Sequence, residues 1–167
     1  MCIRDSYYAA GVLDAAGVMF TASHNPAAYN GMKMAKAGAV PVSSDTGLFE
    51  IRDVAQGYLD AGQIPTAETV GTVEERDILA GYAEYLRSLV DLSDIRPLKV
   101  VVDAGNGMAG KTTPAVLGGD VLEALPLEIV DLYFELDGTF PNHPANPLEP
   151  ENLVDLQKAV VEHGADI

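Results

Sequence analysis

A serine in a short polar turn is the first residue whose type and position suit chemistry. Ser23 stands in the segment 21–26, TASHNP, directly after an apolar run. Because ligands of open α/β sheets bind at the carboxyl ends of strands, this position suits a reactive hydroxyl. Pro26 stiffens the exit from the turn, and His24 could polarise a hydroxyl. Neighbouring residues of an extended segment point to opposite sides, so the Ser-His dipeptide is weak support for a hydrolase dyad. Taken alone, the segment is better explained as a structural turn.

A glycine-rich segment offers a different chemistry. Residues 105–112, GNGMAGKT, match the phosphate-loop pattern G-x-x-x-x-G-K-[ST] and also contain G-x-G-x-x-G. In such a loop Lys111 would reach the outer phosphates of a nucleotide and Thr112 would bind Mg²⁺. A P-loop nucleotide-binding domain using Gly105 to Thr112 is therefore an alternative function. Pro114 counts against it, because proline is tolerated only in the first turn of a helix.

Three further polar residues have simpler explanations. His143 lies in a loop rich in proline and asparagine, with no second His or Cys spaced for a metal site. We expect it to hydrogen-bond backbone carbonyls. Asp103 follows an apolar strand and is expected to form a cap or turn. His163, near the end of a predicted helix, suits the helix dipole.

Hydrophobic periodicity predicts the elements that position these residues in the first half. Apolar residues recur at helical spacing after Asp45, whereas residues 31–36 alternate as in a strand. The predicted helices cover 7–16, 45 to about 59 and 75–90, and the predicted strands cover 17–22, 31–36 and 40–42.

The second half begins a new strand-helix alternation. The segment 93–97 reads as a linker, and we place a domain boundary there. Strands are predicted over 98–103 and 127–132, and helices follow Gly110 and Pro150. Such alternation implies parallel strands in an α/β sheet. The predicted domains are 7–92 and 93–167, and residues 1–6, which lack periodicity, are interpreted as a non-native extension.

Composition excludes several classes of function. The chain has 10 Lys and Arg against 25 Asp and Glu, a formal charge of −15, which repels nucleic-acid phosphates. No apolar run approaches the roughly 20 residues of a membrane helix, and no signal peptide opens the sequence. Cys2 is the only cysteine, so no internal disulfide can form. We therefore expect a cytoplasmic protein with no nucleic-acid or membrane partner.

Four segments together resemble the α-D-phosphohexomutases of the phosphomannomutase/phosphoglucomutase type. The most specific is GVMFTASHNP followed by YNGMK, which is similar to the family's catalytic phosphoserine loop. The resemblance implies an α/β fold with mixed sheets flanked by helices. The chain would hold an incomplete first domain and part of the second domain of a four-domain enzyme. The four segments are 17–33, 45–47, 101–107 and 137–153.

The resemblance also implies a reaction. Ser23 would carry a phosphoryl group and interconvert hexose 6-phosphate and hexose 1-phosphate, of mannose or glucose, through a hexose 1,6-bisphosphate. A Mg²⁺ ion would contact an oxygen of that phosphoserine, so Ser23 would be a metal ligand through its phosphate. Lys33 would act as a proton donor or charge clamp, and His24 would hydrogen-bond the reacting oxygens. Thr21 and Asn25 would support the loop. Such transfers depend mainly on positioning and charge neutralisation.

An anionic substrate requires local positive potential in this acidic chain. We expect it from Lys33, backbone amides and a bound cation. The family's aspartate ligands for Mg²⁺ are absent from the sequence, so we expect the chain alone to be an inactive, non-catalytic fragment. The parent enzyme is expected to be a monomer or dimer that binds a hexose phosphate.

Overall fold

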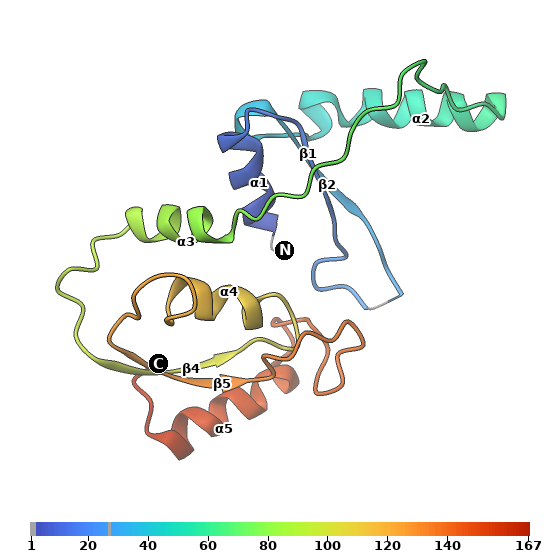
Figure 1. The fold of residues 1–167 in the computed structure, drawn as a ribbon. Coiled ribbons are helices and arrows are strands. Elements are labelled where there is room, and N and C mark those ends of the chain that lie inside the picture. Colours follow the sequence, from blue (N-terminus) through green and yellow to red (C-terminus); the bar gives the residue numbers. More distant parts are fainter. Residues whose placement is uncertain (1–2, 27) are drawn as a thin grey trace.

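The computed structural model describes residues 3–26 and 28–167, which form an α/β fold with two sheets (Figure 1). The first sheet has three antiparallel strands in the order β1-β2-β3, and the second has two parallel strands, β4 and β5. Antiparallel and parallel pairing therefore both occur, with helices beside each sheet. In the first half the elements are α1 (Ile3–Val12), β1 (Gly17–Phe20), β2 (Met32–Lys36), β3 (Val40–Pro41) and α2 (Phe49–Ala61).

The first helix begins earlier than its sequence pattern suggests. Helix α1 already includes Ile3 and ends at Val12, instead of covering 7–16. Asp5 lies in its first turn, where a carboxylate is stabilised by the helix dipole, and it is buried. The structure thus joins residues 3–6 to the helix, although their non-native origin stays a prediction. Met1 and Cys2 lie outside the described residues.

Only one face of the first sheet is covered. Helix α1 packs against β1 and β2, and the side chains of Met19 and Ala35 are buried there. On β1, Val18 and Phe20 alternate with Met19 and are exposed. The alternation follows from the two-residue period of a strand.

Helix α2 begins later than predicted. Residues Ser44–Leu48 form a separate turn, in which Gly47 has φ 123°, so the regular helix starts at Phe49 instead of Asp45. Thr46 stabilises the turn, because its Oγ1 accepts a hydrogen bond of 2.7 Å from the Ser43 N–H.

Helix α3 (Leu79–Ser88) is shorter than the predicted helix 75–90. Residues 75–78 are not helical, and the carboxylate of Asp77 accepts a hydrogen bond of 2.9 Å from the Leu79 N–H. An acceptor at this position satisfies an amide that the first helical turn leaves without a partner. Helix α3 packs against both α1 and α4, and thereby joins the two halves.

The second sheet agrees closely with the sequence pattern. Strands β4 (Leu98–Asp103) and β5 (Leu127–Leu132) pair in parallel and cover the predicted residues. Helix α4 (Ala109–Val116) lies on one face, and a 3₁₀ turn, Pro150–Leu153, leads into α5 (Val154–His163) on the other (Figure 1). His163 lies in the last turn of α5, as expected. Beyond α5, residues 165–167 run beside β4, where the Asp166 N–H donates to the Lys99 carbonyl at 2.8 Å.

Helix α4 approaches the sheet closely because Gly110 has no side chain. A Cβ built at Gly110 would stand 2.0 Å from the carbonyl oxygen of Phe134, closer than any non-bonded contact allows. This glycine therefore permits the packing that brings the start of α4 beside the end of β5.

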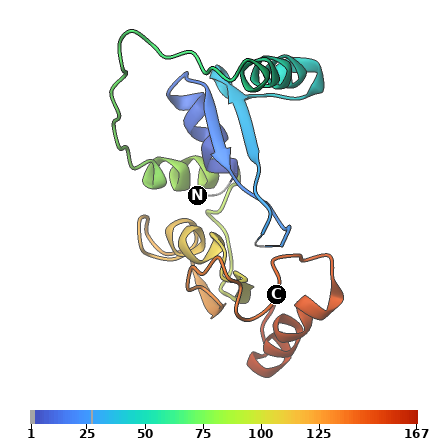
Figure 2. The ribbon, with the colours of Figure 1, turned by 90° about the vertical axis from the view of Figure 1, so that its right-hand side faces the viewer.

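The loop between β1 and β2 reaches from the first sheet to the loops of the second half (Figure 2). Its tip lies against the segment 139–152, with which it lines a cavity. Within the part of the chain that the structure describes, no helix is both long and apolar enough to span a membrane.

Candidate functional site

A cleft of about 610 Å³ separates the serine turn from the carboxyl ends of the second sheet. One wall comes from the β1–β2 loop, and the other from the turn after β4 and the loop before α5. Segments far apart in sequence therefore meet at one site. The first wall is lined by Thr21, Ala22, Ser23, Asn25 and Tyr29, and the opposite wall includes Asp103, Gly105, Gly107, Gly138, Phe140 and His143.

Ser23 has a backbone conformation that side chains rarely adopt. Its φ is 55°, in the left-handed region, and its side chain is exposed. The Ser23 N–H donates a hydrogen bond of 2.9 Å to Oγ1 of Thr21, and the Asn25 N–H donates to the Ala22 carbonyl at 3.1 Å. Strained backbone held in place by such bonds is common at functional sites, because it fixes a side chain in one direction.

The contact between Ser23 and His24 corrects an expectation drawn from the sequence. Ser23 Oγ and His24 Nδ1 lie 3.2 Å apart, so the two side chains point toward each other. The expectation of opposite directions assumed an extended backbone. The left-handed φ of Ser23 turns the chain and brings the imidazole beside the hydroxyl.

The remaining predicted site residues differ in whether they line the cleft. Thr21 and Asn25 both line the cleft, and their role as support for the loop stays a prediction. Lys33 lies on β2, directly opposite Met19 of β1, and does not line this cleft. No hydrogen bond or ion pair joins the side chain of Lys33 to another described residue. Its role near the reacting oxygens stays a prediction.

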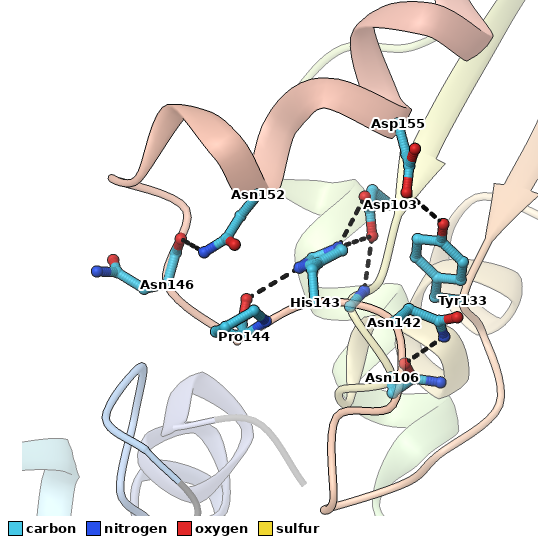
Figure 3. Close-up of polar contacts among 10 residues, drawn as sticks. Asp103, Asn106, Tyr133, Asn142, His143, Pro144, Asn146, Asn152 and Asp155 are labelled. Carbon is cyan, nitrogen blue, oxygen red and sulfur yellow. Dashed lines mark hydrogen bonds and ion pairs between the residues drawn. The ribbon is translucent and has the colours of Figure 1, made fainter.

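A histidine and an aspartate form the polar centre of the second wall (Figure 3). His143 Nε2 lies 3.1 Å from Oδ2 and 3.2 Å from Oδ1 of Asp103, and its Nδ1 lies 2.9 Å from the Pro144 carbonyl oxygen. Both side chains are largely buried. The carbonyl contact was predicted from the sequence, but the pairing with Asp103 was not. Asp103 also accepts a hydrogen bond of 2.8 Å from the Gly105 N–H, and so forms the expected turn.

The pKa of His143 reflects these contacts. Burial of the ring lowers the pKa, but the hydrogen bond to the Pro144 carbonyl and the pairing with Asp103 raise it, and the net result lies above 6.5. Tyr133 packs edge-on against the ring at 5.5 Å, and its hydroxyl donates a 2.6 Å bond to Asp155. That bond raises the pKa of Tyr133.

Two asparagines connect the loops next to this pair by hydrogen bonds (Figure 3). Asn106 is buried, and its side-chain amide donates to the Glu135 carbonyl at 2.9 Å. Its Oδ1 accepts a hydrogen bond of 2.8 Å from Nδ2 of Asn142. Because a buried amide without partners is costly, these bonds hold the turn after β4 against the loop that carries His143.

The glycine-rich segment does not have the geometry of a phosphate loop. A phosphate loop aims free backbone N–H groups at its ligand, whereas six of the eight amides of 105–112 bond within the protein. Lys111 and Thr112 line a separate cavity of about 330 Å³. The nucleotide-binding alternative is therefore not favoured. The bonded amides are Gly105 to Asp103, Asn106 to Tyr133, Gly107 to Ala104, Gly110 to Gly107, Lys111 to Met108 and Thr112 to Met108.

The Mg²⁺ implied by the resemblance lacks a ligand set in this structure. In residues 3–26 and 28–167, no group of three or more His, Cys, Asp or Glu side chains is arranged to hold a metal ion. Asp103 is engaged by His143 and Gly105. The residues present do not fit a complete Mg²⁺ site.

Comparison with known proteins identifies the family. The model of phosphoglucomutase/phosphomannomutase α/β/α domain II matches residues 80–167, and that of domain I matches residues 5–59. The chain belongs to the phosphoglucomutase/phosphomannomutase family. All of helix α3 after its first residue thus lies within the match to domain II, while the boundary placed at residue 93 stays a prediction.

Curated members of this family are similar along most of the chain. It is 48% identical over 153 residues to a protein named "Phosphohexose mutases" from Xanthomonas campestris, a match that covers 91% of this chain and 32% of the relative. It is 43% identical over 169 residues to the phosphomannomutase/phosphoglucomutase of Pseudomonas putida, covering 96% of this chain and 32% of that protein. The chain thus spans about a third of the length of these relatives.

A solved structure of the same family has a similar fold. The phosphoglucomutase/phosphomannomutase family protein of Burkholderia thailandensis matches with a TM-score of 0.69 and 34% identity, over 90% of this chain and 30% of that one. The resemblance read from the sequence is confirmed at the level of family and fold.

The pairing of His143 with Asp103 is the feature that sequence reasoning missed. A usable signal was present, because Asp103 ends β4 and His143 follows β5 on a long loop. The carboxyl ends of two parallel strands meet at the same edge of a sheet, so residues beyond them can be brought together.

Proposed function

We propose that this chain is the phosphoserine-bearing part of a mutase that interconverts hexose 6-phosphate and hexose 1-phosphate. Ser23 carries the transferable phosphoryl group, and the sugar is mannose or glucose. The observation that carries the proposal is the placement of Ser23, which is exposed in a strained turn at the mouth of a cleft, with His24 Nδ1 3.2 Å from its hydroxyl. The names of the relatives support the same reaction class.

The reaction requires two phosphoryl transfers at one serine. In the first, the bond between Ser23 Oγ and phosphorus breaks as a hydroxyl oxygen of the hexose monophosphate bonds to that phosphorus, and the proton of that hydroxyl passes to Ser23 Oγ. The resulting hexose 1,6-bisphosphate reorients, and its other phosphoryl group returns to Ser23. His24 is placed to hydrogen-bond Oγ during both transfers. Thr21 holds the Ser23 amide, so the chain contributes mainly positioning.

We propose Lys33 as the positively charged side chain that the first half of the chain contributes to substrate binding. Its exposed side chain on β2 is free of described partners, so it can move toward an anionic substrate. When bound, a Mg²⁺ ion would neutralise charge on the phosphoryl group. The described residues supply no complete set of ligands for it, and no step is assigned to the ion.

A chimera tests the proposal. This chain would replace the corresponding 153 matched residues of the Xanthomonas campestris relative, so that the rest of that protein supplies its remaining length. We expect the chimera to convert mannose 1-phosphate or glucose 1-phosphate to the 6-phosphate in a coupled assay. Ser23→Ala in the chimera should reduce turnover to background. Normal turnover in the Ser23→Ala chimera would refute Ser23 as the phosphoryl carrier.

The chain alone provides the complementary test. We expect the purified 167-residue chain to have no mutase turnover, because it spans only about a third of its relatives. Measurable, Ser23-dependent turnover by the chain alone would contradict this expectation.

A further inference from the structure

The charge of the cleft is unusual for a site that receives phosphoryl groups. Among the described residues that line it, the ionisable side chains are Asp103, His143 and Tyr29. Among the described residues, neither Lys nor Arg lines this cleft, in keeping with the formal charge of −15 of the whole chain. Only His143 in this lining can therefore carry a positive charge.

The hydrogen bonds of His143 determine its protonation. The Pro144 carbonyl oxygen can only accept, so Nδ1, at 2.9 Å, must donate. Nε2 faces both carboxylate oxygens of Asp103, at 3.1 and 3.2 Å. A neutral imidazole has one N–H, and could not serve both acceptors. Both carboxylate oxygens of Asp103 face Nε2 and one of them also accepts the Gly105 N–H, so Asp103 acts as an acceptor and the proton belongs on the ring.

The groups that face the ring come from three elements. Asp103 ends β4, Tyr133 follows β5, and Asp155 belongs to α5. Both carboxylates favour the imidazolium, and burial of the ring opposes it. The favourable contacts outweigh the burial of the ring, so the pKa of His143 is raised, in agreement with its hydrogen bonds.

We propose that His143 is a positioning residue of the phosphoryl site, whose imidazolium cancels the Asp103 carboxylate in the cleft that Ser23 faces. The inference rests on the proposed function, in which Ser23 carries a phosphoryl group. With a neutral side chain at position 143, Asp103 would present an uncompensated negative charge to that group. The neutralised pair keeps the cleft receptive to phosphate without any Lys or Arg in its lining.

Coupling between charges is reciprocal, which provides the test. If the imidazolium stabilises a phosphoryl group on Ser23, then that group must stabilise the imidazolium to the same extent. NMR would follow the ring protons of all histidines against pH in the 167-residue chain. One sample would carry serine at position 23, and the other phosphoserine installed during translation. A chelator would keep both free of metal.

The chain contains its own controls, because its three histidines occupy different places. His24 contacts Ser23 directly, so its titration midpoint must rise on phosphorylation. His163, in the last turn of α5, should not respond. We expect the midpoint of His143 to rise by on the order of half a pH unit, the effect of a phosphoserine charge of about −1.5 to −2 across a wet cleft. The His143→Gln variant assigns the resonance.

Two results would overturn the proposal. The first is a His143 midpoint that is the same with and without the phosphoryl group while that of His24 rises. The second is a His143 midpoint in unmodified protein that does not fall when Asp103→Asn removes the carboxylate. Because the phosphoserine is installed directly, this experiment can succeed even if the chimera shows no turnover, so failure of the proposed function is seen separately.

Discussion

The two walls of the cleft are built in opposite ways. The serine wall is an exposed loop held by a few local hydrogen bonds, such as that from the Ser23 N–H to Thr21. The opposite wall is partly buried, and its bonds join residues far apart in sequence, including Asp103 with His143 and Asn106 with Asn142. The comparison teaches that Ser23, the proposed phosphoryl carrier, lies on a loop with few supporting bonds, whereas the surface it faces is held by bonds between distant segments. Substitutions should therefore affect stability strongly on one side and weakly on the other.

The largest expected effect is at Gly110. Gly110→Ala would place a Cβ 2.0 Å from the Phe134 carbonyl oxygen, so α4 must move away from the sheet. We expect the free energy of unfolding to fall by about 3 kcal/mol, measured by urea denaturation. Gly57→Ala is the matched control, because Gly57 lies in exposed α2 with nothing within 4 Å of the added Cβ. It should stabilise the chain by roughly 0.5–1 kcal/mol. Equal effects of both variants would contradict the close packing of α4 against the residues that follow β5.

The next effect is expected at Asn106. Asn106→Ala removes the bonds to Glu135 and Asn142 and places alanine at a φ of 57°. We expect a loss of about 2 kcal/mol in urea denaturation. Asn106→Gly loses the same bonds but adopts the left-handed conformation freely, and should cost about 1 kcal/mol less than alanine. If the alanine and glycine variants lose the same free energy of unfolding, the left-handed backbone at position 106 contributes nothing to the stability of this wall.

A smaller, pH-dependent effect is expected at His143. Because its pKa is raised in the folded chain, the His143–Asp103 pair stabilises the fold fully below the unfolded value of 6.5, and this contribution is lost as pH rises through the higher folded value. His143→Gln should cost about 1–2 kcal/mol at pH 5.5. The difference from wild type should shrink toward pH 8.5. His163→Gln controls for histidine loss elsewhere, and a His143 difference that is constant with pH would contradict the ion pair.

The smallest effect on stability is expected at Ser23. Its side chain is exposed, so Ser23→Ala should change the free energy of unfolding by no more than about 0.5 kcal/mol. The same variant should remove all phosphoryl acceptance at this position, measured by intact-protein mass spectrometry of the chimera after incubation with glucose 1,6-bisphosphate. A large loss of stability would mean that the serine wall is as tightly packed as the opposite one.

Local sequence patterns were sufficient for the second sheet. Strands β4 and β5 have the predicted bounds because their apolar runs form a parallel pair with α4 on one face and α5 on the other (Figure 1). The predicted positions of the helix ends were less accurate. Periodicity extended the third helix to residues 75–90, but the structure begins it after Asp77, where a side chain bonds the first free amide. The bonding partners of helix ends depend on neighbouring segments, which periodicity does not record.

The sequence by itself determined the family, the α/β class and Ser23 as the residue to test, because these follow from residue types and spacing within short segments and from the order of those segments. Only the tertiary structure decided that Ser23 and His24 face each other, that most amides of the glycine-rich segment are bonded internally, and that His143 pairs with Asp103 across 40 residues of chain. The physical reason is that side-chain direction and amide bonding depend on backbone φ and on packing between distant segments. These are properties of the folded chain and are absent from a local pattern.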